Sequence, residues 1–269
     1  MTQPTSRIIE DLPVVAEHWA GEGPPIVFLH AGVCDRRAWR EVAELLAGRR
    51  QVVTYDQRGF GDTPLGDAPF RHVDDLILLL ERLTAESPAQ LVGSSMGGQL
   101  ALDVTVLREE LVSDLVLFAP AVSGAPEPEA FEPHTQRLIE QLQAAGAAED
   151  LAELIRLEAW MWLDGPGSPE GRVSGPQRKL MRQMNDIILR NDPPEAAEDS
   201  GITAWQRLAD ITIPVTVAWG TLDAPSVIDQ CQQLIARLPN ATGQALTGLA
   251  HLPYLEDPQV VAELIDNAL

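Results

Sequence analysis

The sequence has few of the residues that define several large classes of protein. It contains two cysteines, Cys34 and Cys231, in 269 residues, too few for a disulfide scaffold or a cysteine-based zinc site. Its longest apolar runs, such as residues 76–80, are far too short to span a bilayer, and the first ten residues contain no apolar signal core. We therefore expect a cytoplasmic protein that has no membrane partner.

Basic residues are also scarce. The chain has 19 lysines and arginines against 40 aspartates and glutamates, which gives a formal charge of −21. Such a field repels nucleic acid at long range, so we expect no nucleic-acid partner. Hydrophobic residues make up 45% and charged residues 22% of the chain, which is ordinary for a soluble globular protein. The length suits one large domain, or one domain that carries an insertion.

Short apolar runs alternate with helical patterns along most of the chain. Because these runs are continuously apolar, they indicate strands buried on both faces of a parallel sheet. They cover residues 26–29, 52–55, 91–92, 115–118 and 215–218. Between them, apolar residues recur at helical spacing, as in residues 73–80 and 228–238, for which Ser226 is a candidate N-cap. The alternation predicts an α/β protein with a mostly parallel, doubly wound sheet.

Residues 123–205 interrupt this alternation. The segment begins with a proline-rich run at 125–128 and continues as helical patterns separated by Gly/Pro loops. An inserted helical cap over the active edge of the sheet is the natural interpretation. We therefore expect a main domain formed by residues 1–122 and 206–269, with residues 123–205 as the cap.

Residues 93–97 read G-S-S-M-G, which is the pattern G-x-S-x-G. They follow the 91–92 run and open a helical pattern. A serine on such a strand-to-helix turn is forced into a strained backbone geometry that projects its hydroxyl outward. The amino terminus of the helix offers backbone N–H groups to a developing oxyanion. A glycine-rich turn can arise by chance, but this context favours Ser95 as a nucleophile and the N–H of Met96 as an oxyanion donor.

Residues 30–33 read H-A-G-V and directly follow the 26–29 run. A loop at this place can supply the second oxyanion donor, for which the backbone N–H of Gly32 is the candidate. We expect His30 to pin the loop by hydrogen bonds rather than to act as a base. Val33 is a candidate to line the substrate pocket, and Cys34 either lines that pocket or simply packs in the core.

Asp223 and His251 are the candidates that would activate the serine. Asp223 follows the 215–218 run, at the carboxyl end of a parallel strand, where such sheets place their sites; the alternative is an ordinary aspartate in a surface turn. A serine hydroxyl needs a positioned imidazole to take its proton. Among five histidines, only His251 lies on a loop after the last strand. The order Ser95, Asp223, His251 matches the α/β-hydrolase arrangement.

With these residues in view, the chain resembles members of the α/β-hydrolase superfamily over nearly its whole length. Residues 55–63 (Y-D-Q-R-G-F-G-D-T) are similar to the family's Y-D-x-R-G-x-G-x-[ST] loop, and residues 251–258 (H-L-P-Y-L-E-D-P) are similar to its H-x-P-x-x-E-x-P ending. The first loop is mainly structural in such proteins, so Asp56 and Arg58 are not expected to be catalytic. The resemblance implies the α/β-hydrolase fold with an inserted helical cap.

The chain departs from the family pattern at one position, and a second position argues against two branches of the family. The usual His-Gly pair is His30-Ala31 here, so the role of Gly32 is carried over by position. The serine at the elbow argues against haloalkane dehalogenases and epoxide hydrolases, which use an aspartate there. Residues 162–166 (W-L-D-G-P) are similar to cap segments of small bacterial esterases and enol-lactonase-like proteins.

The resemblance implies a serine hydrolase that cleaves small carboxylic esters or lactones through an acyl-enzyme. Such an enzyme needs no metal and no organic cofactor, and it would work as a monomer or a homodimer. Two alternatives keep the same triad: a C–C bond hydrolase or a cofactor-free haloperoxidase. A third alternative is a small-molecule receptor that retains the triad, because the fold alone does not decide function.

The predicted cap contains two sets of residues that bear on the substrate. Apolar side chains either line an acyl pocket or pack the cap onto the main domain; they are Trp160, Trp162, Met181 and Met184. They favour a neutral or weakly polar acyl group. From residue 172 to residue 190, the sequence contains five basic residues and only one acidic residue, Asp186. These cations either form salt bridges with the acidic main domain or clamp a carboxylate of the substrate.

Overall fold

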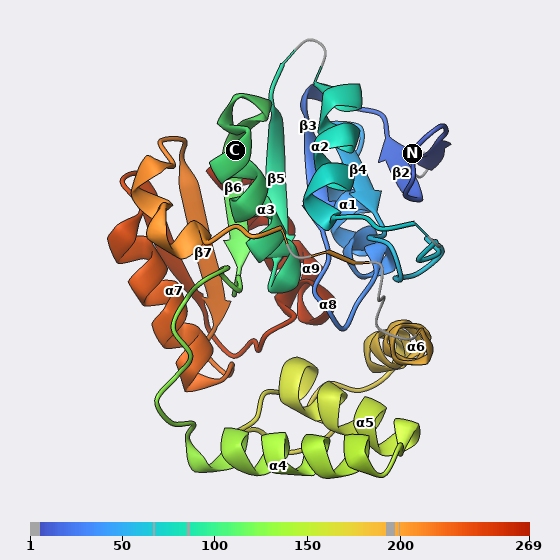
Figure 1. The fold of residues 1–269 in the computed structure, drawn as a ribbon, viewed down its shortest axis with the longest axis vertical. Helices are drawn as coiled ribbons and strands as arrows, with labels where there is room; N and C mark the ends of the chain where they lie inside the picture. The colour runs from blue at the N-terminus through green and yellow to red at the C-terminus, as the bar shows by residue number, and fades with distance from the viewer. Residues whose placement is uncertain (1–5, 67, 85–86, 192–196, 199) are drawn as a thin grey trace.

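The sheet is the central layer of the fold (Figure 1). The structure is a computed structural model that describes residues 6–66, 68–84, 87–191, 197–198 and 200–269. Within these residues, eight strands form one sheet in the order β1-β2-β4-β3-β5-β6-β7-β8. The strands are β1 (Ser6–Ile9), β2 (Ala16–Trp19), β3 (Glu22–Leu29), β4 (Arg50–Tyr55), β5 (Ala89–Ser94), β6 (Val112–Phe118), β7 (Val215–Gly220) and β8 (Ala241–Leu246).

The strand pairing confirms the predicted mostly parallel sheet. In the sheet order β4-β3-β5-β6-β7-β8, every neighbouring pair is parallel. The pairs β1 with β2 and β2 with β4 are antiparallel. The five predicted runs lie within β3 to β7. β5, with neighbours on both sides, is buried at all six of its residues, which explains why this strand carries no alternating pattern.

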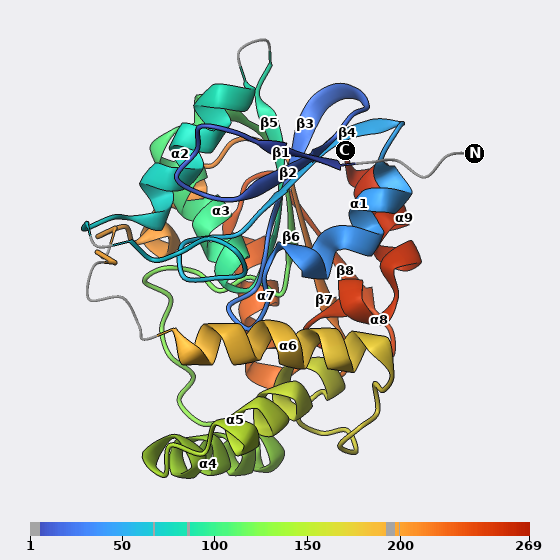
Figure 2. The ribbon, with the colours of Figure 1, turned by 90° about the vertical axis from the view of Figure 1, so that its right-hand side faces the viewer.

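Helices cover both faces of the sheet (Figure 2). α2, α3 and α7 pack on one face, in a core that contains Leu76, Leu100 and Leu234, and α1 and α9 pack on the other face, in a core that contains Trp39 and Val261. The helices of this part of the chain are η1 (Arg36–Trp39), α1 (Arg40–Leu46), α2 (His72–Leu83), α3 (Met96–Leu107), η2 (Glu109–Leu111), η4 (Ala204–Gln206), η5 (Leu208–Asp210), α7 (Pro225–Arg237), α8 (Pro253–Glu256) and α9 (Pro258–Ala268). The sheet is therefore doubly wound, as predicted.

The start of α7 differs from the prediction. Ser226 was the candidate N-cap, but the helix begins at Pro225 and its N-cap is Ala224. Proline suits the first helical position because it has no N–H to leave unsatisfied and its φ is already helical. The helix therefore starts one residue before the serine.

A helical segment connects β6 to β7 and lies along the edge of the sheet where the parallel strands end (Figures 1 and 2). We use "the helical segment" for residues 133–190. It consists of α4 (Pro133–Ala147), α5 (Leu151–Glu158), a π-helical turn (η3, Ala159–Asp164) and α6 (Pro176–Arg190). α4 and α5 share a small core around Leu138, Leu157 and Met161. Of the helices in the described part of the chain, none has the length and apolarity to cross a membrane.

Candidate active site

Ser95 lies between β5 and α3, on a sharp turn. Its φ is 50° and its ψ is −116°, a backbone conformation that residues other than glycine rarely adopt. The N–H of Ser95 donates to the carbonyl of Phe118 on β6, 3.0 Å away, and this bond helps hold the strained residue. A Cβ at Gly93 would lie 2.6 Å from the carbonyl oxygen of Gly97, and a Cβ at Gly97 would collide with the carbonyl of Leu29. The close approach of α3 to β3 and β5 therefore requires glycine at both positions.

The two candidate oxyanion donors come from neighbouring segments, a loop and the start of a helix. Gly32 follows β3, and Met96 is the first residue of α3. A Cβ at Gly32 would lie 3.6 Å from the Sδ of Met96, so the two residues are neighbours in space. Val33, next in the chain, packs against the same core as Trp39 and Leu252.

Asp223 and His251 form a direct contact. Asp223 follows β7, and His251 lies between β8 and α8. The Nδ1 of His251 lies 2.7 Å from the Oδ2 of Asp223, and the side chains of these two residues are 5% and 0% exposed. The other carboxylate oxygen of Asp223 accepts a hydrogen bond from the N–H of Ala224 at 2.7 Å. An imidazole that donates through Nδ1 to a carboxylate keeps Nε2 available to accept a proton.

The helical segment reaches this pair through one of the two predicted tryptophans. The ring of Trp162 lies 4.7 Å from the imidazole of His251, centroid to centroid. Trp160 is placed differently, because its Nε1 donates to the carbonyl of Ser168 at 2.8 Å and its ring packs in the core of α4 and α5. Met181 and Met184 are fully buried in the core that also contains Leu252. The structure therefore brings Trp162, and not Trp160, to the candidate histidine.

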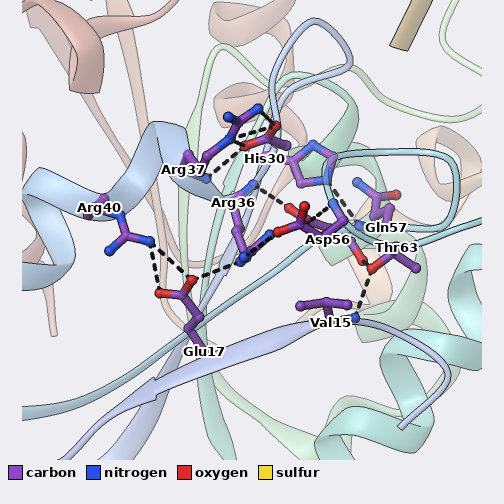
Figure 3. Close-up of polar contacts among 11 residues, drawn as sticks. Val15, Glu17, His30, Arg36, Arg37, Arg40, Asp56, Gln57 and Thr63 are labelled. Atoms are coloured by element: carbon purple, nitrogen blue, oxygen red, sulfur yellow. Dashed lines mark hydrogen bonds and ion pairs between the residues drawn. The ribbon is translucent and has the colours of Figure 1, made fainter. Parts of the chain in front are cut away.

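His30 fixes the loop after β3, as predicted (Figure 3). Its Nε2 accepts from the N–H of Gln57 at 3.1 Å, so its Nδ1 carries the proton and donates to the carbonyl of Ala31 at 3.0 Å. Burial lowers the pKa of His30 to about 4, which keeps the imidazole neutral near pH 7. His30 thus ties the candidate oxyanion loop to the loop that follows β4.

The loop after β4 is held by an ion-pair network around the buried Arg36 (Figure 3). Arg36 contacts Asp56, and it also binds Glu17 at 3.1 Å and Asp62 at 2.7 Å. Burial raises the pKa of Asp56 to about 6, although the charge of Arg36 opposes the rise. Further along the loop, Arg58 binds Asp75 of α2 at 2.7 Å. These contacts account for the structural role that the resemblance implied for residues 55–63.

Comparison with known proteins bears out the fold. Residues 26–264 match the model of the "Alpha/beta hydrolase family". The chain belongs to the alpha/beta hydrolase family. It is similar to the pimeloyl-[acyl-carrier protein] methyl ester esterase of Vibrio atlanticus (strain LGP32), with 24% identity over 93% of this chain and 96% of that protein.

Solved structures of the same architecture are similar at lower sequence identity. Est816, described as an N-acyl homoserine lactone degrading enzyme, matches with a TM-score of 0.73 and 20% identity over 98% of this chain and 100% of that chain. A bromoperoxidase from Bacillus anthracis matches with a TM-score of 0.74 and 20% identity over 98% of each chain. At this identity the likeness shows the alpha/beta-hydrolase fold alone.

In this alpha/beta hydrolase, Glu256 positions the histidine loop, a role that the sequence reading missed. Its Oε1 accepts from the N–H of Ala250 at 2.7 Å, and its Oε2 binds Arg172 at 2.5 Å. Glu256 is the glutamate of the H-x-P-x-x-E-x-P ending, so its place in that motif could have indicated a role near His251. Arg172 carried no comparable signal, because its partner lies 84 residues away in the chain.

The basic residues between positions 172 and 190 are mostly paired in this alpha/beta hydrolase. Arg172 bridges to Glu256 of the sheet region, Arg178 binds the fully buried Asp164 at 2.6 Å, and Arg190 binds Asp186 at 2.8 Å. Lys179 and Arg182 border a surface hollow next to α5. Among the residues that the structure describes, no group of three or more His, Cys, Asp or Glu side chains is arranged to hold a metal ion.

Proposed function

We propose that the protein is a serine hydrolase that cleaves small carboxylic esters or lactones. Ser95 is the nucleophile, His251 the general base and Asp223 the residue that orients the base. The observation that carries this proposal is the buried contact of 2.7 Å between His251 and Asp223, at the sheet edge where the strained Ser95 directly precedes α3. The similar Vibrio protein is a methyl ester esterase, which supports ester chemistry.

The proposed reaction has two halves. The hydroxyl of Ser95 attacks the acyl carbon while Nε2 of His251 takes the hydroxyl proton, and Asp223 stabilises the imidazolium that forms. The backbone N–H groups of Gly32 and Met96 stabilise the negative oxygen of the tetrahedral intermediate. His251 then protonates the leaving alcohol, and a water activated by the same histidine releases the acid. In a lactone the alcohol and the acid belong to one molecule.

The helical segment is proposed to act as a cap over this edge, within an insertion of residues 123–205 between main-domain parts 1–122 and 206–269. Trp162 supports this role because it contacts His251. A cavity of about 390 Å³ opens beside Met96, between Phe60 and Leu65 of the sheet region and Ile188 and Leu189 of α6. Its apolar lining favours a neutral acyl or alkyl group.

Replacement of two neighbouring serines tests the proposal. Ser95→Ala should lower kcat/KM for an activated ester such as p-nitrophenyl acetate by about 10⁴ or more, because nucleophilic attack is lost while the oxyanion donors remain. Ser94→Ala is the matched control in the residue before it, and it should stay within about tenfold of the wild type.

Two results would contradict the proposal. The first is Ser95→Ala activity within about tenfold of the wild type. The second is a wild type that reacts once with each ester and then stops, since that behaviour belongs to a receptor rather than to a turnover enzyme.

A further inference from the structure

Two polar side chains join the helices of the helical segment on its inner side. Asn185 of α6 is 1% exposed, and its Nδ2 donates to the Oε2 of Glu158, the last residue of α5, at 2.6 Å. Met181 and Met184, the two other buried residues of α6, pack toward the sheet region. The pair therefore lies on the side of α6 that faces the sheet.

The pair keeps one buried hydrogen-bond acceptor that no described residue uses. The Oδ1 of Asn185 is buried and accepts no hydrogen bond within the described part of the chain. Burial raises the pKa of the Glu158 carboxyl, and its hydrogen bond from Asn185 only partly opposes the rise. A buried acceptor without a partner is unfavourable, so the Oδ1 of Asn185 calls for a partner from outside the chain.

The location of the pair connects it to the proposed site. Ala159, the residue after Glu158, is buried in the same core as Cys34. Cys34 comes two residues after Gly32, the proposed oxyanion donor. Trp162, four residues after Glu158, contacts His251. The residues that follow Glu158 therefore pack in the region that contains the oxyanion loop and the histidine.

We propose that Glu158 and Asn185 accept hydrogen bonds from an O–H or N–H donor on the substrate and thereby select donor-bearing esters. This inference rests on the proposed function of the same site. Because both residues present oxygen atoms, a substrate group that only accepts hydrogen bonds gains nothing there. The alternative is that the pair merely holds α5 and α6 together, in which case its loss would affect all substrates alike.

Matched ethyl esters separate the two roles. Ethyl glycolate and glycine ethyl ester place a hydroxyl or an ammonium where ethyl propionate has a methyl group, and ethyl 3-hydroxypropionate and β-alanine ethyl ester do the same for ethyl butyrate. The wild type should prefer at least one donor ester over its methyl counterpart by about tenfold in kcat/KM, as expected when a site leaves polar atoms unpaired without the donor. Comparing the hydroxyl with the ammonium arm identifies which donor is taken.

Two substitutions test the assignment. Glu158→Gln keeps a side-chain oxygen for Asn185 but turns an N–H₂ donor toward the substrate, so the donor preference should fall by about tenfold while the methyl esters change by less than about threefold. Asn185→Leu, which removes the second acceptor at similar size, should lower the preference in the same direction. Glu140→Gln is the matched control, because Glu140 is exposed on α4 and bonded to Gln136.

The inference is wrong if the wild type shows no donor preference at either position. It is also wrong if Glu158→Gln lowers kcat/KM equally for donor and methyl esters. Ethyl propionate distinguishes this failure from a failure of the proposed function. If the wild type hydrolyses it and Ser95→Ala does not, the serine mechanism stands whatever the donor esters show.

Discussion

The loops at the sheet edge and the helical segment beside them are held in different ways. Each candidate catalytic loop is tied to its neighbours by backbone hydrogen bonds, such as Ser95 N–H to Phe118 at 3.0 Å and Leu222 N–H to Leu249 at 2.9 Å. The helical segment instead reaches the sheet region through a few side chains, including Arg172 to Glu256 and Trp162 to His251.

This difference suggests that the sheet edge governs turnover, whereas the helical segment governs substrate preference. Backbone hydrogen bonds, together with buried side chains such as His30 and Glu256, fix the loops to within the small errors that catalysis tolerates. Side-chain anchors can be replaced one at a time, so the helical segment can vary while the sheet edge stays constant. Substitutions at the edge should therefore change turnover, and substitutions in the helical segment should change stability and substrate preference.

Asp223→Asn should give the largest effect. The amide would still accept from Ala224, so the fold should persist, but it would hold the imidazole in the wrong tautomer and lower kcat by about 10³ to 10⁴. Steady-state kinetics with p-nitrophenyl acetate measures the loss. Asp229→Asn is the control, because Asp229 is exposed on α7 and bonded to Gln233 at 2.6 Å. A nearly silent Asp223→Asn would mean that another acid orients His251.

Asp164→Asn, in the helical segment, should instead lower stability and leave kcat nearly unchanged. Its carboxylate is fully buried and accepts from the N–H groups of Gly171 at 2.8 Å and Val173 at 2.9 Å as well as from Arg178 at 2.6 Å. Removing its charge should lower the free energy of unfolding by about 2–4 kcal/mol, measured by urea denaturation, while kcat stays within about tenfold.

Asp186 offers a matched control for Asp164, because it is an exposed carboxylate in the same helical segment. Asp186→Asn breaks an exposed pair with Arg190 and should cost no more than about 0.5 kcal/mol. If Asp164→Asn lowers kcat as much as Asp223→Asn does, the division between the sheet edge and the helical segment is wrong.

The smallest expected effect concerns His30. Burial lowers its pKa from 6.5 to about 4, so between these values the unfolded chain binds a proton that the folded chain does not. Acidification therefore weakens the folded state through this residue. The stability difference between the wild type and His30→Gln should shrink by about 2 kcal/mol between about pH 6.5 and pH 5, as measured by urea unfolding. A constant difference would show that His30 titrates alike in both states.

Most of the sheet could be predicted because its strands leave a local signal. Strands buried on both faces are continuously apolar, and the glycines around Ser95 mark a turn that only small residues allow. β8 carried no such signal. Its residues 242–245 are exposed at the sheet edge, so nothing in their composition required a strand.

The inner side of the helical segment could not be predicted for a different reason. Trp160 and Trp162 are two positions apart and therefore point to different sides of their helical turn, but only the packing of that turn decides that Trp162 is the one that reaches His251. Glu158 and Asn185 are 27 residues apart and meet only because α5 packs on α6. Such pairings depend on tertiary placement, which periodicity along one helix does not report.

The most direct test of the serine mechanism is the identity of the acylated residue. The wild type is mixed with p-nitrophenyl acetate, quenched with acid during the first turnover and digested for mass spectrometry. The account predicts one acetyl group per chain, on Ser95, and no acetyl group in Ser95→Ala. Acetyl on another side chain, or steady turnover by Ser95→Ala, would contradict it.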